Sequence, residues 1–190
     1  MGCFIMSIDS KLIAIFGQSG CGKSTLVREF VARSSDYATP ISYTTRSPRQ
    51  DDRPGQYSYV SRTWIESNHS DFLLASLYGQ YYATSLSDIT KLLESSRNVI
   101  LEVSKENALN LAQRFVGRTK LIHLQCSEQV RIERLCRRGM SAEVIRQRQQ
   151  SEYEADLDTE MSFDGHSYHF IDASGSLTTV IAMVEERIAL

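Results

Sequence analysis

Short apolar runs alternate along the chain with longer segments in which apolar residues recur every three or four positions. The short runs predict buried strands at Lys11–Phe16, Asn98–Val103, Lys120–Gln125 and Tyr168–Ile171. The longer segments predict amphipathic helices at Thr25–Val31, Ser85–Ser95, Lys105–Phe115, Glu128–Arg138, Ser141–Glu154 and Leu177–Ile188. Strands that alternate with helices in this way predict an α/β fold with a mostly parallel sheet.

The segment from Tyr37 to Tyr82 interrupts this alternation. It is rich in Ser, Thr, Arg and Tyr, it contains all three prolines of the chain, and its polar residues alternate with aromatic ones. Such a segment is too long for a loop without secondary structure of its own. We therefore expect a small β-rich insertion that projects from the sheet and holds a second substrate.

Composition places the chain among ordinary globular domains. Its 190 residues, 42% hydrophobic and 23% charged, are enough for one domain with a sizeable core. The net charge of −2 argues against a nucleic-acid partner, and no segment reaches the roughly 18–20 apolar residues that span a membrane. The four cysteines have no metal-ligand spacing, which favours a reducing compartment. We therefore expect a cytoplasmic protein, a monomer or homodimer, whose partners are small-molecule substrates.

One segment carries specific chemistry. The residues Gly17–Ser24 read GQSGCGKS and match the phosphate-binding loop G-x-x-x-x-G-K-[ST], between an expected strand and an expected helix as the motif requires. Its glycines allow backbone N–H groups to surround a phosphate at the N-terminus of the helix. The amine of Lys23 can then reach the β- and γ-phosphates, and the Ser24 hydroxyl can ligate Mg²⁺. The predicted ATP-binding residues are Gly17, Gln18, Ser19, Gly20, Cys21, Gly22, Lys23, Ser24 and Thr25.

A second phosphate site is predicted inside the insertion. Arg46 and Arg49 lie three residues apart, in a segment that Pro48 stiffens. The planar fork of each guanidinium matches phosphate oxygens, so two converging forks suit a phosphate dianion. The hydroxyls of Tyr57 and Tyr82 could add donors to it. A solvated basic turn explains these residues equally well when they are considered alone.

These segments together resemble the guanylate kinase family. Ser42–Arg49, followed by Gly55–Ser61, is similar to the family's acceptor-binding segment. Gly79–Ser85 resembles its G-N-Y-Y-G-[TS] stretch. Arg134–Gly139 resembles its R-L-x-x-R-G lid entry, and Ile145–Arg148 the lid helix that follows. In order and approximate spacing, the similarity covers most of the chain.

The resemblance implies a P-loop NTPase three-layer sandwich, with an acceptor-binding subdomain at residues 37–84 and a helical lid at residues 134–155. It also implies phosphoryl transfer from ATP·Mg²⁺ to a nucleoside 5′-monophosphate, with GMP as the first candidate. The acceptor-binding residues that it implies are Ser42, Arg46, Arg49, Tyr57, Tyr82 and Glu102. The catalytic residues that it implies are Lys23, Arg134, Arg138 and Arg148, with Glu102 beside Ser24 at the metal and Asp172 near the adenine of ATP.

The residues expected to recognise guanine depart from the family pattern. The position of the family's base-reading glutamate falls on Leu74, and that of a second carboxylate falls on Ser104. Each lost charge-assisted hydrogen bond is worth roughly 1.5–3 kcal/mol, which is enough to change the acceptor. Asp71 and Glu66 are the acidic residues that could substitute.

Two alternatives therefore stay open. Ribose 1,5-bisphosphate phosphokinases share the fold and need no base reader, and Leu73–Ser76 and Gly175–Leu177 resemble their stretches. The dipeptide Lys23–Ser24, by contrast, differs from the Lys-Asp of that family. The other alternative is a non-catalytic guanylate-kinase-like binding module, which the intact phosphate loop disfavours.

Overall fold

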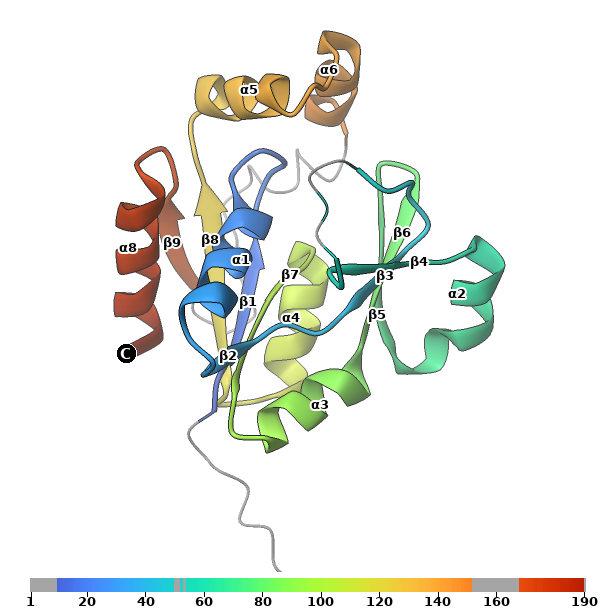
Figure 1. The fold of residues 1–190 in the computed structure, drawn as a ribbon, viewed down its shortest axis with the longest axis vertical. Helices are drawn as coiled ribbons and strands as arrows, with labels where there is room; N and C mark the ends of the chain where they lie inside the picture. Colours follow the sequence, from blue (N-terminus) through green and yellow to red (C-terminus); the bar gives the residue numbers. More distant parts are fainter. Residues whose placement is uncertain (1–9, 50–51, 53, 152–167, 190) are drawn as a thin grey trace, which may run out of the picture.

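A computed structural model describes residues 10–49, 52, 54–151 and 168–189 (Figure 1). Its main sheet contains five parallel strands in the order β2-β7-β1-β8-β9. In that order the strands are Tyr37–Ala38, Asn98–Glu102, Leu12–Phe16, Thr119–Gln125 and Tyr168–Asp172. Four of them are the strands that the apolar runs predict. The expected α/β fold with a parallel sheet is confirmed.

The central strand β1 divides the core into two layers because its side chains alternate between the faces of the sheet. Ile13 and Ile15 pack against α1 (Lys23–Arg33) and α8 (Leu177–Ala189). Leu12, Ala14 and Phe16 pack on the other face, against α3 (Leu86–Glu94) and α4 (Lys105–Arg114). All five residues of β1 are fully buried. Helices on both faces of the sheet make the sandwich three layers deep.

A second sheet lies beside the first (Figure 1) and has the order β4-β3-β6-β5. In that order its strands are Tyr57–Tyr59, Ser42–Thr44, Gln80–Ser85 and Phe72–Leu77. Stacked rings of Tyr43 and Trp64, with centroids 4.9 Å apart, form part of its small core together with Phe72.

The insertion differs from the expected one in two respects. Its expected boundary at residue 37 lies too early, because β2 (Tyr37–Ala38) pairs with β7 in the main sheet. It also contains α2 (Arg62–Asn68) and a 3₁₀ turn (His69–Asp71), which the aromatic alternation did not predict. The helix has a single buried side chain, Ile65, and so it lacks the apolar repeat that would reveal it.

Helices α5 (Glu128–Arg137) and α6 (Ala142–Gln149) lie above the end of the main sheet (Figure 1). Serine side chains begin both helices, since Ser127 accepts from the N–H of Val130 and Ser141 from that of Val144. Helix α6, the expected lid helix, ends at Gln149. Residues 152–155 of the expected lid lie outside the described residues. No helix in the described ranges has the length and apolar character needed to cross a membrane.

Candidate active site

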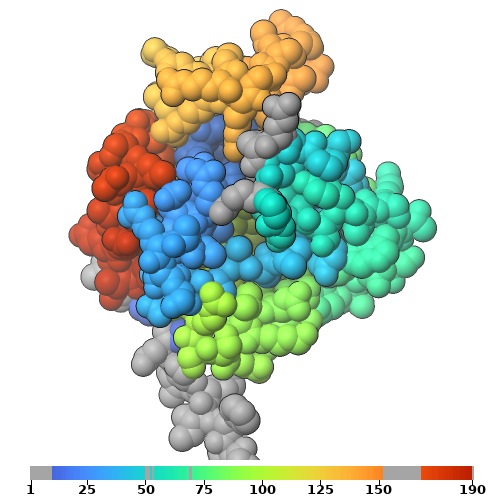
Figure 2. Space-filling model, in the orientation of Figure 1, coloured from blue at the N-terminus to red at the C-terminus, as the bar shows by residue number. Residues whose placement is uncertain are grey.

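The site lies where the parallel strands end. All carboxyl ends of a parallel sheet share one edge, which is where α/β proteins bind ligands. The phosphate loop follows β1 there, and Glu102 ends β7. Figure 2 shows the surface hollowed between α1 (blue) and the small sheet (cyan), beneath α5 and α6 (orange). One cavity at this edge is lined by residues of both sheets, of α1 and α6, and by Arg138, which follows α5.

The phosphate loop has a backbone that other residues would not adopt easily. Gly17, Gly20 and Gly22 all have positive φ. A Cβ at position 17 would lie only 2.0 Å from the carbonyl oxygen of Leu124, so a residue with a side chain would clash there. The glycine therefore allows the loop to pack directly against β8 before it turns into α1.

The polar side chains of the loop face the cavity. Nζ of Lys23 donates to the carbonyl oxygens of Gly17 and Gln18 at 2.8 and 2.9 Å. Ser19, Lys23 and Ser24 line the cavity together with Gly20, Gly22 and Thr25, whereas the loop residues Gly17 and Gln18 do not. The amine of Lys23 is thus held within the loop, close to where a phosphate would enter.

The three predicted lid arginines contact the phosphate loop or the segment after β9. Arg148 donates to Oγ of Ser19 at 2.8 Å, and its guanidinium stacks 4.4 Å above the ring of Tyr78. Arg138 donates to Oγ of Ser24 at 3.4 Å. Arg134 donates to the carbonyl oxygen of Cys21, in the phosphate loop, at 3.3 Å and to that of Ala173, after β9, at 2.8 Å. The structure therefore places Arg138 and Arg148 on the wall of the main cavity and Arg134 between the loop and the segment after β9.

A fourth arginine, Arg131, was missed by sequence reasoning. It is buried on α5, one turn before Arg134, and donates to Oε1 of Gln18 and to the carbonyl oxygen of Ser19 (3.1 Å for the latter). Its place on the same helix face, three residues before Arg134, is the signal that could have found it. Arg131 holds the phosphate loop from behind.

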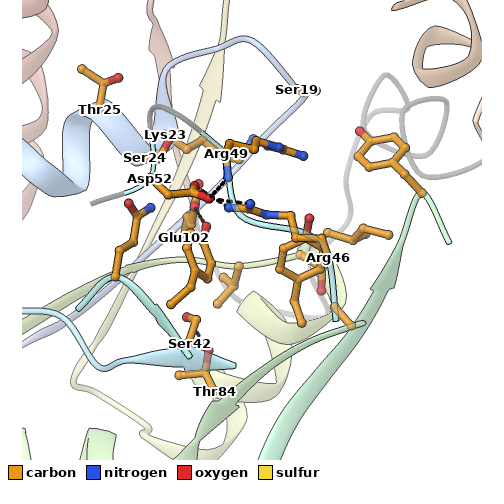
Figure 3. A pocket seen from close by; sticks show the side chains of 18 of the residues that line it. Ser19, Lys23, Ser24, Thr25, Ser42, Arg46, Arg49, Asp52, Thr84 and Glu102 are labelled. Carbon is orange, nitrogen blue, oxygen red and sulfur yellow. Dashed lines mark hydrogen bonds and ion pairs between the residues drawn. The ribbon is translucent and has the colours of Figure 1, made fainter. Parts of the chain in front are cut away.

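On the side of the cavity formed by the small sheet, Arg46 binds an acid that the sequence did not single out. Both terminal nitrogens of the Arg46 guanidinium bind the carboxylate of Asp52, at 2.6 and 2.5 Å (Figure 3). The same carboxylate accepts from the backbone N–H of Arg49 at 2.6 Å and from the hydroxyl of Tyr59 at 2.6 Å. Burial alone would raise the pKa of Asp52, but these bonds from Arg46, Tyr59 and Arg49 lower it well below its usual range.

The remaining predicted acceptor residues also line this cavity. Arg49, Tyr82, Ser42 and Glu102 are on its wall. The hydroxyl of Tyr57 donates to Oε1 of Glu102 at 3.0 Å, and burial together with this carboxylate raises the pKa of Tyr57 well above its usual range. Tyr57 also lies under Arg46, whose guanidinium carbon is 4.5 Å from its ring centroid. The cavity wall thus carries two arginines and two tyrosines, with the carboxylate of Glu102 beside Tyr57.

The wall beside these groups is apolar. In the hairpin of β5 and β6, Leu73 pairs with Thr84 and Ala75 pairs with Tyr82. Paired residues share a face, and Leu73, Ala75 and Leu77 line the cavity with Tyr82 and Thr84.

This pairing corrects the expectation that Leu74 stands at the base-reading position. Leu74 lies on the opposite face of β5 and is 39% exposed. A shift of one residue in the alignment turns a strand's side chains to the other face. The two expected substitutes also lie elsewhere, because Asp71 accepts from Ser85 and Glu66 pairs with Arg62 at the surface.

Two polar residues line the cavity beside the apolar wall. Ser104 caps α4 by accepting from the N–H of Asn107 at 3.2 Å, and both side chains are largely buried at the cavity. Nδ2 of Asn107 donates to the carbonyl oxygen of Leu74 at 3.3 Å. Sequence reasoning noticed Ser104 as a departure and missed Asn107, which supports β5 from α4.

A second hollow lies behind the phosphate loop. Its wall includes Cys21, Leu26, Arg134, Ala173 and Leu177. Asp172, the predicted adenine contact, lines neither of the two cavities. Its carboxylate accepts from the N–H of Ser174 at 2.9 Å and so shapes the turn after β9.

Comparison with known proteins identifies relatives of this chain. The model of the guanylate kinase family matches residues 9–166. A guanylate kinase of Clostridium perfringens is 33% identical over 132 residues, a match that covers 67% of this chain and 61% of that protein. A guanylate kinase of Synechocystis is 30% identical over 163 residues, and this match covers 83% of this chain and 85% of that protein. The matched segment thus spans about three fifths of the clostridial relative.

Solved structures agree on the fold. The crystal structure of guanylate kinase from Anaplasma phagocytophilum aligns with a TM-score of 0.67 at 15% identity, over 95% of this chain and 85% of that one. A gluconokinase from Sinorhizobium meliloti aligns with a TM-score of 0.52 at 17% identity, over 95% and 93% of the two chains. At these identities the likeness concerns the arrangement of the elements.

Proposed function

Because this chain belongs to the guanylate kinase family, we propose that it transfers the γ-phosphoryl group of ATP to the phosphate of a nucleoside 5′-monophosphate, with GMP as the acceptor. One observation carries this proposal. A single cavity is lined at one end by Ser19, Lys23 and Ser24 and at the other by Arg46, Arg49, Tyr57 and Tyr82. Two phosphate-binding ends in one cavity suit a transfer between two phosphates.

At the donor end, ATP binds across Gly17–Thr25, whose N–H groups face its phosphates at the start of α1. Lys23 exchanges its two carbonyl contacts for the β- and γ-phosphates. The second hollow, beside Cys21 and Ala173, receives the adenine. This direction of the nucleotide follows from the position of that hollow behind the loop.

Mg²⁺ fits the residues at this end. Ser24 and Glu102 supply oxygen atoms on the wall of the same cavity, and oxygen is the donor that Mg²⁺ prefers. The described residues contain no cluster of three or more His, Cys, Asp or Glu side chains that could bind a metal. That suits an ion that takes most of its ligands from ATP phosphates and water. When bound, the ion would neutralise charge on the phosphoryl oxygens.

At the acceptor end, the monophosphate binds Arg46 and Arg49. Within the described part of the chain, Nε of Arg46 is a buried donor without a hydrogen-bond partner, and a phosphate oxygen would satisfy it. Arg46 is also held in place by Asp52, which keeps its fork oriented before the acceptor arrives. The hydroxyls of Tyr57 and Tyr82 complete the set of donors.

The transfer itself needs positioning and charge stabilisation. A phosphate oxygen of the acceptor attacks the γ-phosphorus in line, the bond to the β-phosphate oxygen breaks, and ADP leaves. A phosphate dianion needs little help from a general base. Lys23, Arg138 and Arg148 lie where they can stabilise the transferring oxygens, and Arg134 joins them from the second hollow. Helices α5 and α6 cover the reaction and exclude water.

An assay of ADP release tests the acceptor. ATP·Mg²⁺ is offered with GMP, dGMP, AMP, UMP, dTMP and ribose 1,5-bisphosphate, each over a range of concentrations. We expect the highest kcat/KM with GMP, because the named relatives are guanylate kinases. A preference for the sugar phosphate would overturn the GMP assignment. It would mean that the apolar wall of β5 belongs to a site that does not recognise a base. ATP binding without turnover on any acceptor would instead favour a binding module.

A further inference from the structure

Two cysteines from distant parts of the chain meet beside the phosphate loop. Sγ of Cys126 lies 3.6 Å from Sγ of Cys21 and donates a hydrogen bond to it. The residues are 105 positions apart in sequence. Parallel pairing of β1 with β8 brings them together, because Cys21 lies in the loop after the first strand and Cys126 directly follows the second. Both are free thiols in this structure.

The contact between these sulfurs requires little movement to become covalent. A disulfide bond is about 2.05 Å long, so the two sulfurs need to approach by about 1.5 Å from their 3.6 Å separation. Arg134 already bridges the pair, as its Nη1 lies 3.3 Å from the carbonyl oxygen of Cys21 and 3.8 Å from Sγ of Cys126.

We propose that Cys21 and Cys126 form a reversible disulfide in the presence of a hydroperoxide, and that this bond stops phosphoryl transfer by holding the phosphate loop out of its ATP-binding shape. The chemistry needs two steps. The Cys21 thiolate attacks the peroxide oxygen and becomes a sulfenic acid, with loss of hydroxide, which takes up a proton to give water. The Cys126 thiol then displaces this hydroxyl as a second water. In total, two thiols and one hydrogen peroxide give one disulfide and two waters.

The surroundings of Cys21 favour the first step. The hydrogen bond from Cys126 lowers the pKa of the Cys21 thiol to about 7; burial opposes this change, and the charges of Lys23 and Arg131 assist it. The thiolate is the reactive form, so this shift increases the reactive fraction of Cys21 at neutral pH. Cys21 is only 1% exposed, but it lines the second hollow, which admits a small oxidant.

The new bond would disturb the loop because the loop has little room to adapt. The backbone of Gly17 packs against Leu124, two residues before Cys126. Drawing Cys21 toward Cys126 would shift the N–H groups that surround the phosphates, and a misplacement of about 1 Å can cost on the order of 100-fold in rate. The bond would also tie the loop to the segment just before α5, the helix that carries Arg131 and Arg134, both of which contact the loop.

The test begins with a parent variant, Cys3→Ser with Cys136→Ser, in which the proposed pair are the only thiols. Hydrogen peroxide is added and then removed with catalase. Mass spectrometry of the peptides should show a Cys21–Cys126 cross-link with a loss of two hydrogens. Turnover should fall at least tenfold at the same rate as the cross-link forms, and dithiothreitol should restore it.

The matched control adds Cys126→Ser to this parent. We expect no cross-link, and a Cys21 sulfenic acid that persists long enough to be labelled by dimedone. Unmodified thiols in the parent after treatment, or a cross-linked parent with undiminished turnover, would overturn the proposal. The cross-link is measured without activity, so its failure is distinguishable from failure of the proposed function, on which only the inhibition depends. Protection by ATP but not by GMP alone would further support the position of Cys21 beside the donor.

Discussion

The two ends of the main cavity obtain their binding groups in different ways. At the donor end, the polar groups belong to one continuous loop, with Lys23 and Ser24 at the start of α1, and arginines on α5 and α6 cover them. At the acceptor end, Arg46 and Arg49 follow β3, whereas the wall on β5 presents Leu73, Ala75 and Leu77. In the proposed function, phosphate binding and recognition of the rest of the acceptor therefore depend on separate elements. The phosphate-binding elements are rich in charge. The apolar wall of β5 can change without disturbing them.

The largest effect is expected at the donor end. Lys23→Ala should lower kcat by at least about 10³-fold, because it removes the cation that stabilises charge on the transferring phosphoryl group. Steady-state ADP release measures it. Lys91→Ala, which removes an exposed lysine from α3, is the control and should keep the parent rate. A near-parent rate for Lys23→Ala would contradict the assignment of the donor site.

A large but selective effect is expected from Arg46. Arg46→Lys keeps the charge and loses the planar fork, so KM for the acceptor should rise by about 10–100-fold while KM for ATP changes by less than about threefold. Arg62→Lys, at an exposed arginine that also pairs with a carboxylate, serves as the control. Equal increases in both KM values would mean that Arg46 does not belong to the acceptor end.

The apolar wall offers a matched pair of substitutions on one strand. Ala75→Glu places a carboxylate in the cavity, where it can accept from the two donors on the edge of guanine. We expect the ratio of kcat/KM for GMP over UMP to rise by about tenfold, which corresponds to about 1.4 kcal/mol. Leu74→Glu, on the exposed face of β5, should leave the ratio unchanged. An increase with Leu74→Glu instead would contradict the strand register.

The smallest effect concerns stability. The pKa of Asp52 is lowered below its ordinary 3.8 in the folded protein, so its ionised form stabilises the fold above about pH 4, and this contribution is lost as the pH falls below that value. Asp52→Asn should lower the Tm at pH 7 by about 2–4 °C for each kcal/mol lost. The difference from the parent should shrink between pH 4 and pH 2. A constant difference across this range would show that Asp52 does not act through its charge.

Much of the donor end could be predicted from the sequence because its determinants are local. The motif Gly17–Ser24 is continuous, and the apolar patterns on either side predict the strand and the helix that it needs. The order of strands and helices in the main sandwich could be predicted for the same reason. The helix in the insertion could not be predicted, because α2 has one buried residue and no apolar repeat.

Two features depend on contacts between elements that the sequence does not place together. Asp52 is one acid in a polar loop, and only the packing of β3 and β4 makes it the partner of Arg46. Arg131 contacts the phosphate loop only because α5 crosses the end of the sheet.

By itself, the amino-acid sequence determined the family, the phosphate loop and the alternation of strands and helices, because each depends on residues close together in the chain. Tertiary structure alone decided which face of β5 lines the cavity, since a one-residue difference in a hairpin reverses the direction of every side chain. It also decided that Cys21 and Cys126 touch, because the neighbouring positions of β1 and β8 in the sheet follow from packing across the whole domain.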